Sequence, residues 1–179
     1  MFQHIDYLKK GNHKQQQAYK TIHELNLLNV LSDYSPTLCG TIPIELDLPN
    51  SDLDIIMEVH DFDQVATILD HQYQSNEGYE RKMKKIRGRD VLKVNFSYKG
   101  FVFELFGQDL PVDKQNAYLH MVIEYKLLQK YDGLREIIRG LKREGFNTEA
   151  AFAHVFVLEG DPYDALLEYG REQGYIAKT

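Results

Sequence analysis

The stretch CGTIPIELDLPNSDLDII (Cys39–Ile56) decides the fold, through the residues at its two ends. It opens on the pair Gly40 and Thr41 and closes on Asp52 and Asp54, which stand at the start of an apolar run. Because residues i and i+2 of a strand point to one face, these two carboxylates are predicted to lie side by side. Two close carboxylates repel unless a cation lies between them, and Mg²⁺ or Mn²⁺ is the usual hard cation with oxygen ligands. We therefore expect a metal site here, with Gly40 permitting close backbone approach and Thr41 able to donate to a phosphate oxygen.

The segments around this stretch alternate between strand-like and helix-like patterns. Apolar residues three or four apart predict one helix over about 12–31. Asp61 is expected to cap a second helix. Strands are predicted over 37–40, 53–59, 79–87, 91–98 and 101–106, with a proline-containing loop over 41–51. Lys99-Gly100 is a turn signal, so the last two strands should form a hairpin.

After Pro111 the pattern becomes wholly helical. Helices are predicted over 116–130 and 134–144, with Gly145 as the C-terminal cap of the second. Two more helices are expected to begin at Asn147 or Thr148, and at Asp161-Pro162. The expected organisation is therefore a core over residues 1–110 and a helical segment over residues 111–179 that packs on it.

The spacing of the two motifs resembles the nucleotidyltransferase superfamily, which has the polymerase-β-like fold. In that superfamily a strand ends in Gly-Ser or Gly-Gly, and Asp-x-Asp follows at the start of the next strand; here Gly40 precedes Asp52 by 12 positions. The resemblance implies an α+β fold, a mixed β-sheet flanked by helices, with a C-terminal helical segment. It also implies a third acid on a later strand. Glu104 is the candidate, because it is an acid in an otherwise apolar strand, where an unpaired carboxylate would be costly.

The resemblance also implies roles. The metal-binding and catalytic residues would be Asp52, Asp54 and Glu104, and the nucleotide-binding residues would be Gly40, Thr41 and Ser51. The implied activity is metal-dependent transfer of a nucleoside monophosphate from an NTP to an acceptor that the sequence does not identify. Two departures favour an alternative, a catalytically silent module that binds a nucleotide or a partner protein. Thr41 stands where the superfamily has serine, and Ile42–Leu48 replaces a short arginine-containing helix.

Most of the chain also resembles a bacterial family of nucleotidyltransferase-like proteins of uncharacterised function. The segments that carry this second resemblance are Gly40–Ile44, Ser51–Asp54, Glu104–Gln108, Gln115–Tyr118 and Gly160–Tyr163.

Several residues admit a second interpretation. Glu104 would serve a metal, or it would pair with Lys93 across the hairpin. The basic stretch Arg81–Arg89 would be a solvated edge strand, or a clamp for a triphosphate or an RNA acceptor. His120 and Glu124 share a helix face, which suits either a site or an ordinary helix contact.

Composition limits the class of protein. The net charge of −6 argues against nucleic acid as the general partner, and only Arg81–Arg89 keeps an RNA acceptor open. Hydrophobic residues make up 43% of the chain, which is typical of a globular protein. The single cysteine, Cys39, cannot form an intrachain disulfide and is expected to be a buried core residue, so we expect a cytoplasmic protein. Met1–Asp6 does not look like a signal peptide, and no apolar run approaches the roughly 20 residues of a membrane span.

Overall fold

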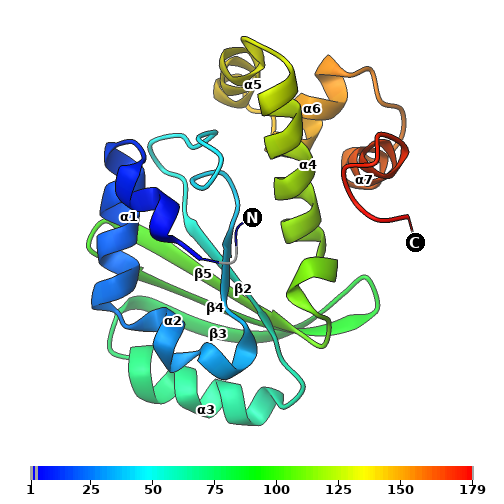
Figure 1. The fold of residues 1–179 in the computed structure, drawn as a ribbon. Coiled ribbons are helices and arrows are strands. Elements are labelled where there is room, and N and C mark those ends of the chain that lie inside the picture. Colours follow the sequence, from blue (N-terminus) through cyan, green and yellow to red (C-terminus); the bar gives the residue numbers. More distant parts are fainter. Residues whose placement is uncertain (1, 3, 179) are drawn as a thin grey trace. The chain divides into compact units, whose positions relative to one another are not determined.

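The computed structural model describes residue 2 and residues 4–178; Met1, Gln3 and Thr179, which the predicted ranges 1–110 and 111–179 include, lie outside the described residues. The chain divides into two compact units. Unit 1 comprises Met1–Pro43 and Ser51–Val112, and unit 2 comprises Ile44–Asn50 and Asp113–Thr179 (Figure 1). The segment between the two sequence motifs therefore groups with the helical part of the chain. The packing of residues 111–179 on residues 1–110 stays a prediction.

Unit 1 contains a mixed five-stranded sheet, as predicted. Its strands are β1 (Thr37–Cys39), β2 (Leu53–Glu58), β3 (Glu77–Ile86), β4 (Arg89–Tyr98) and β5 (Phe101–Gln108). The order is β1-β2-β5-β4-β3, with β2 and β5 parallel and all other neighbours antiparallel. The predicted hairpin is confirmed, since β4 and β5 meet at Lys99-Gly100, whose φ angles of 46° and 79° suit a two-residue turn with left-handed backbone.

The helices of unit 1 are α1 (His13–Glu24), α2 (Leu27–Val30) and α3 (Phe62–Tyr73), with short 3-10 turns η1 (Asp6–Lys10) and η2 (Ser32–Tyr34). The prediction of one helix over 12–31 is wrong. The chain turns at Asn26, whose φ of 52° is left-handed, and asparagine tolerates that conformation better than most residues. Asp61 caps α3 as predicted, because its side chain accepts a hydrogen bond from the Gln64 backbone N–H at 2.9 Å.

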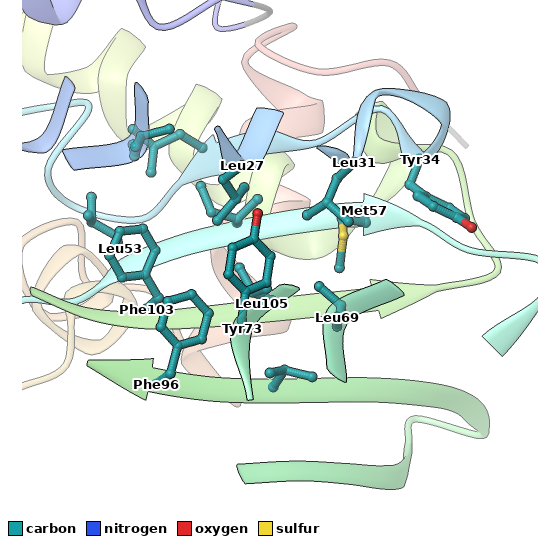
Figure 2. Close-up of a cluster of buried hydrophobic side chains, with 14 of the residues drawn as sticks. Leu27, Leu31, Tyr34, Leu53, Met57, Leu69, Tyr73, Phe96, Phe103 and Leu105 are labelled. Atoms are coloured by element: carbon teal, nitrogen blue, oxygen red, sulfur yellow. The ribbon is translucent and has the colours of Figure 1, made fainter. Parts of the chain in front are cut away.

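One face of the sheet forms the hydrophobic core of unit 1. Alternate strand residues such as Leu53, Phe96 and Phe103 are buried in one cluster with residues of the helices. Figure 2 shows the Tyr73 ring from α3 beside these aromatics; its centroid lies 5.3 Å from that of Phe96, which in turn lies 5.1 Å from that of Phe103. Because side chains alternate along a strand, Asp54, next to Leu53, is directed to the opposite face.

Unit 2 is helical, as predicted. After the 3-10 turn η3 (Val112–Lys114), its helices are α4 (Asn116–Lys130), α5 (Leu134–Arg143), α6 (Thr148–Val155) and α7 (Pro162–Glu172). Gly145 ends α5 with a φ of 104°, and the next N–H, of Phe146, donates to the Leu141 carbonyl at 3.1 Å, which is a Schellman arrangement. Asp161 caps α7 with its side chain. In the described part of the chain, no helix combines the length and the apolar character that a membrane span needs.

A polar cluster lies inside unit 2. His120 and Glu124, one turn apart on α4, are each only 4% exposed. The ring of His120 lies 2.9 Å from the Tyr163 carbonyl through Nε2 and 3.6 Å from the Glu149 carboxylate through Nδ1. Burial raises the pKa of Glu124 well above its usual value, the negative charge of Glu149 raises it further, and Lys142 opposes both effects. This pair therefore belongs to a packed polar network within the helices.

The aromatic stack predicts a large stability cost for removing one of its buried rings. Replacing Phe103, which is fully buried, by alanine should reduce the free energy of unfolding by about 3–5 kcal/mol, since it leaves a cavity. Val102→Thr is the matched control, because Val102 is the next residue of β5 and is 46% exposed; it should change stability by about 0.5 kcal/mol or less. Urea unfolding of both variants checks this, and equal losses would contradict the assignment of the two faces.

The raised pKa of Glu124 predicts a pH dependence of stability. The unfolded chain ionises this group near pH 4.3, whereas the folded chain keeps it protonated to higher pH, so the contribution of Glu124 to stability should fall as the pH rises above about 4.3. Glu124→Gln removes this proton linkage. The variant should therefore gain on wild type with rising pH, by at most about 1.4 kcal/mol for each pH unit. Unfolding at several pH values measures the effect, with Glu168→Gln at an exposed position of α7 as the control; parallel profiles of wild type and Glu124→Gln would contradict it.

Candidate functional site

Three carboxylates meet on the sheet face opposite the core. The parallel register of β2 and β5 places Asp54 beside Glu104, and Asp52 precedes Asp54 by two residues. Asp52, Asp54 and Glu104 are all half-buried, and each contributes a carboxylate oxygen to a group whose members lie within 4.8 Å of one another. The structure thus brings together the three acids that the sequence singled out.

This clustering is unfavourable without a cation. Two unit charges about 4 Å apart repel by roughly 4 kcal/mol at an effective dielectric constant of 20, and a third carboxylate adds to the cost. A divalent ion would replace that repulsion by attraction. The donor set is composed entirely of carboxylate oxygens, which suits Mg²⁺ or Mn²⁺ better than softer metals.

Gly40 makes room for one of the acids. Cys39 is the register partner of Asp54 across β1 and β2, so Gly40 follows directly beside that carboxylate. The φ of Gly40 is 79°, and a Cβ at this position would overlap Asp54 Oδ2. Glycine therefore serves twice here, for its left-handed backbone and for the space it leaves. Cys39 itself is buried, as expected, and burial followed by the charge of Asp54 raises the pKa of its thiol, so it is not an activated nucleophile.

The segment between the two motifs, residues 42–50, begins and ends at residues that lie close together. The Thr41 hydroxyl lies 3.4 Å from the Ser51 hydroxyl, so two of the predicted nucleotide-binding residues are close together, and the third, Gly40, directly precedes Thr41. No helix forms between them, so the backbone N–H groups of an arginine-containing helix are not present at this turn.

Within unit 2, side chains of α5 bind residues 44–47 of this segment. On α5, Arg135 donates to the carbonyls of Ile44 and, at 3.1 Å, of Glu45, and Lys142 donates to the Leu46 carbonyl at 2.9 Å. Arg139 forms an ion pair at 4.0 Å with the carboxylate of Asp47. The sequence patterns do not predict this role. The signal was the spacing of positions 135, 139 and 142, which places three cations along one helix face.

Strand β4 adds two polar residues to the carboxylate face. Asn95 is the register partner of Glu104, and Lys93, two residues earlier, points to the same side. Lys93 Nζ lies 2.6 Å from Glu104 Oε2, so both interpretations of Glu104, the metal group and the ion pair, have a geometric basis. The side-chain oxygen of Asn95 is buried and has no hydrogen-bond partner among the described residues. An acceptor of this kind beside Glu104 fits a site that binds water or a ligand.

The basic stretch Arg81–Arg89 forms most of β3 and its turn. This strand is an outer edge of the sheet, as one interpretation expected, and its residues are largely exposed. Its cations divide between the two faces. Arg81 pairs with Asp70 of α3 at 3.0 Å, whereas Lys82 is the register partner of Lys93 and pairs with Glu80 at 2.6 Å.

A second acidic group was not predicted from the sequence. His60, after β2, contacts Asp109 through Nδ1 and lies 3.0 Å from Glu58 through Nε2. The hydrogen bond and charge of Asp109, followed by Glu58, raise the pKa of His60. Glu58 is the last residue of β2, and His60 and Asp109 follow the carboxyl ends of β2 and β5, so only the register of these two strands reveals that the three residues are close.

Solved structures share this fold. The chain aligns with the polymerase core of TRAMP, an RNA surveillance complex, at 15% identity with a TM-score of 0.54, covering 87% of this chain and 49% of that one. A cytoplasmic RNA terminal U-transferase aligns at 16% identity with a TM-score of 0.56, and the alignment covers 80% of this chain and 47% of that one. A chain of the GLD-2/RNP-8 complex aligns at 13% identity with a TM-score of 0.58, and the alignment covers 97% of this chain and 72% of that one. These likenesses show that the fold is that of the polymerase-β-like nucleotidyltransferases, as the motif spacing predicted.

This chain spans less than half the length of the first two of these structures. None of the curated proteins matches it. A family model matches residues 20–169, which is most of the chain, and it is described as a domain of unknown function, DUF4269. The chain therefore belongs to the DUF4269 family and has a nucleotidyltransferase-like fold.

Proposed function

We propose that the protein is a metal-dependent nucleotidyltransferase that moves a nucleoside monophosphate from an NTP to an acceptor hydroxyl. The observation that carries the proposal is the group formed by Asp52, Asp54 and Glu104, whose carboxylate oxygens lie within 4.8 Å of one another. The space that Gly40 leaves for Asp54 supports it, because this arrangement serves no evident packing purpose. The fold shared with RNA-modifying polymerases is consistent with it.

Each residue has a role in this proposal. Asp52 and Asp54 would hold a divalent cation against the nucleotide phosphates, and Glu104 would complete a second cation position. Such cations neutralise phosphate charge and favour the ionised form of an acceptor hydroxyl. Gly40 would bring its backbone close to the terminal phosphates, and the hydroxyls of Thr41 and Ser51 would donate to phosphate oxygens. We place the reaction in the cytoplasm, in keeping with the single buried thiol.

A second candidate function is a silent module on the same fold, which binds a nucleotide or a partner protein without transfer. The observation that favours it is the turn after Gly40, where Ile44–Asn50 groups with unit 2 and no helix N-terminus is present. Pyrophosphate release from an NTP, dependent on Asp52, distinguishes the two functions. Ligand binding with no release under any acceptor condition would support the silent module.

A metal-dependent stabilisation by nucleotides tests the site directly. A ligand that binds only the folded protein adds about 2.7 kcal/mol of stability at a hundredfold excess over its dissociation constant. We expect an NTP with Mg²⁺ or Mn²⁺ to raise the thermal midpoint of wild type, and Asp52→Asn/Asp54→Asn to abolish that rise. Asp33→Asn, at an exposed position of unit 1, is the control and should respond as wild type does. A rise that persists in the double variant would refute this nucleotide site.

Gly40→Ala tests the fit of Asp54 to the backbone. The added methyl group would strain a left-handed residue, at a cost of about 1–2 kcal/mol, and would displace the Asp54 carboxylate. Gly88→Ala is the matched control, because Gly88 has a φ of 81° and nothing within 4 Å of an added Cβ. Both variants should lose similar stability in EDTA, whereas only Gly40→Ala should lose the stabilisation by Mn²⁺. Thermal unfolding with and without Mn²⁺ measures this, and full Mn²⁺ stabilisation of Gly40→Ala would contradict the site geometry.

A further inference from the structure

Lys93 is the cation that the structure places on the carboxylate group. Its ammonium lies 2.6 Å from Glu104 Oε2, and the side chains of Lys93 and Glu104 are only 27% and 26% exposed. Partial burial weakens the screening of these two charges by solvent, so each acts on the other more than it would at a fully exposed position.

The register explains why Lys93 reaches Glu104 and a neighbouring lysine does not. Asn95 lies directly opposite Glu104. Lys93 is two residues away from Asn95 on β4, so it is the diagonal neighbour of Glu104 on the same face. Lys82 is the register partner of Lys93 on β3, one strand further from the acids, and it pairs with Glu80 at 2.6 Å. The two lysines therefore have the same charge and face but different partners.

A metal ion and Lys93 make conflicting demands on Glu104. A carboxylate can accept from an ammonium through one oxygen and bind a cation through the other, but the two positive charges would then lie only a few ångströms apart. That repulsion weakens the binding of a cation at Glu104.

We propose that Lys93 is a built-in counter-ion of the carboxylate group, which competes with a divalent cation for Glu104. In the nucleotide-free protein it neutralises part of the negative charge and opposes the binding of a divalent cation at Glu104. This inference rests on the metal site of the proposed function and adds to it a positioning residue from β4. It makes the nucleotide-free protein a weaker binder of divalent ions than its three carboxylates alone would be.

Mn²⁺ binding to the full chain without nucleotide tests the inference. The electron paramagnetic resonance signal of free Mn²⁺ gives the bound fraction. Lys93→Met should bind Mn²⁺ about tenfold more tightly than wild type, because the competing charge is gone. Lys93→Arg keeps the charge and should stay near wild type, and Lys82→Met is the matched control that should not change binding. The gain should vanish in the Glu104→Gln background, where Lys93→Met/Glu104→Gln should bind as Glu104→Gln does.

Thermal unfolding gives a second readout, which shows whether Lys93→Met is folded and separates its stability from its binding of Mn²⁺. In EDTA, Lys93→Met should unfold at a lower temperature than wild type, and Mn²⁺ should raise its midpoint by more than it raises that of wild type. Equal or weaker Mn²⁺ binding by Lys93→Met, or the same gain in the Glu104→Gln background, would overturn the inference. Absence of Mn²⁺ binding from both wild type and Lys93→Met would overturn it together with the metal site. If Lys93→Met gains Mn²⁺ affinity while NTPs give no shift, the competition stands and the nucleotidyltransferase proposal fails.

Discussion

The parallel pairing of β2 with β5 is the constraint on which the candidate site depends. These strands are neighbours in the sheet, although α3 and two further strands separate them along the chain. Their register sets Asp54 beside Glu104 and, at the same time, Leu53 beside Phe103 in the core. A slip of one residue would turn the carboxylates toward the core and the apolar residues toward solvent. The hydrophobic effect that selects this register therefore also holds the acids together against their repulsion.

Two features accommodate the carboxylates, one by space and one by charge. The backbone at Gly40 leaves space in which the Asp54 carboxylate sits against the chain, and β4 presents Lys93 to the acid at the other end of the group. Neither feature contributes to the core. Both features concern the carboxylates, which is why we look for a ligand at this face. At the buried His120 and Glu124, by contrast, the His120 ring already contacts the Tyr163 carbonyl and the Glu149 carboxylate.

The local patterns in the sequence predicted the strands, the hairpin and the C-terminal helices, because each depends on nearby residues such as Lys99-Gly100 or Asp161-Pro162. The break at Asn26 was missed because the apolar spacing continues across it and says nothing about φ. Spacing and resemblance single out Asp52, Asp54 and Glu104, whose carboxylate oxygens lie within 4.8 Å of one another in the structure. The sequence alone does not say whether Glu104 serves a metal or pairs with Lys93. The answer depends on register, since Lys93 and the acids become neighbours only once β2, β5 and β4 are aligned. The partners of Ile44–Asn50 were equally out of reach, because the cations of α5 lie about ninety positions away.

The grouping of Ile44–Asn50 with the helices has a consequence for dissecting the molecule. The chain passes from one unit to the other after Pro43, after Asn50 and after Val112. A fragment that stops near Pro111 would retain both motifs but would lose the residues that contact the segment between them. Ile44 and Leu46, each at most 1% exposed in the whole chain, would lose the Arg135 and Lys142 side chains of α5 that donate hydrogen bonds to their carbonyls. The two units are thus interleaved in sequence, and neither can be obtained by a single cut; a genetic separation would need a short bridge in place of residues 44–50.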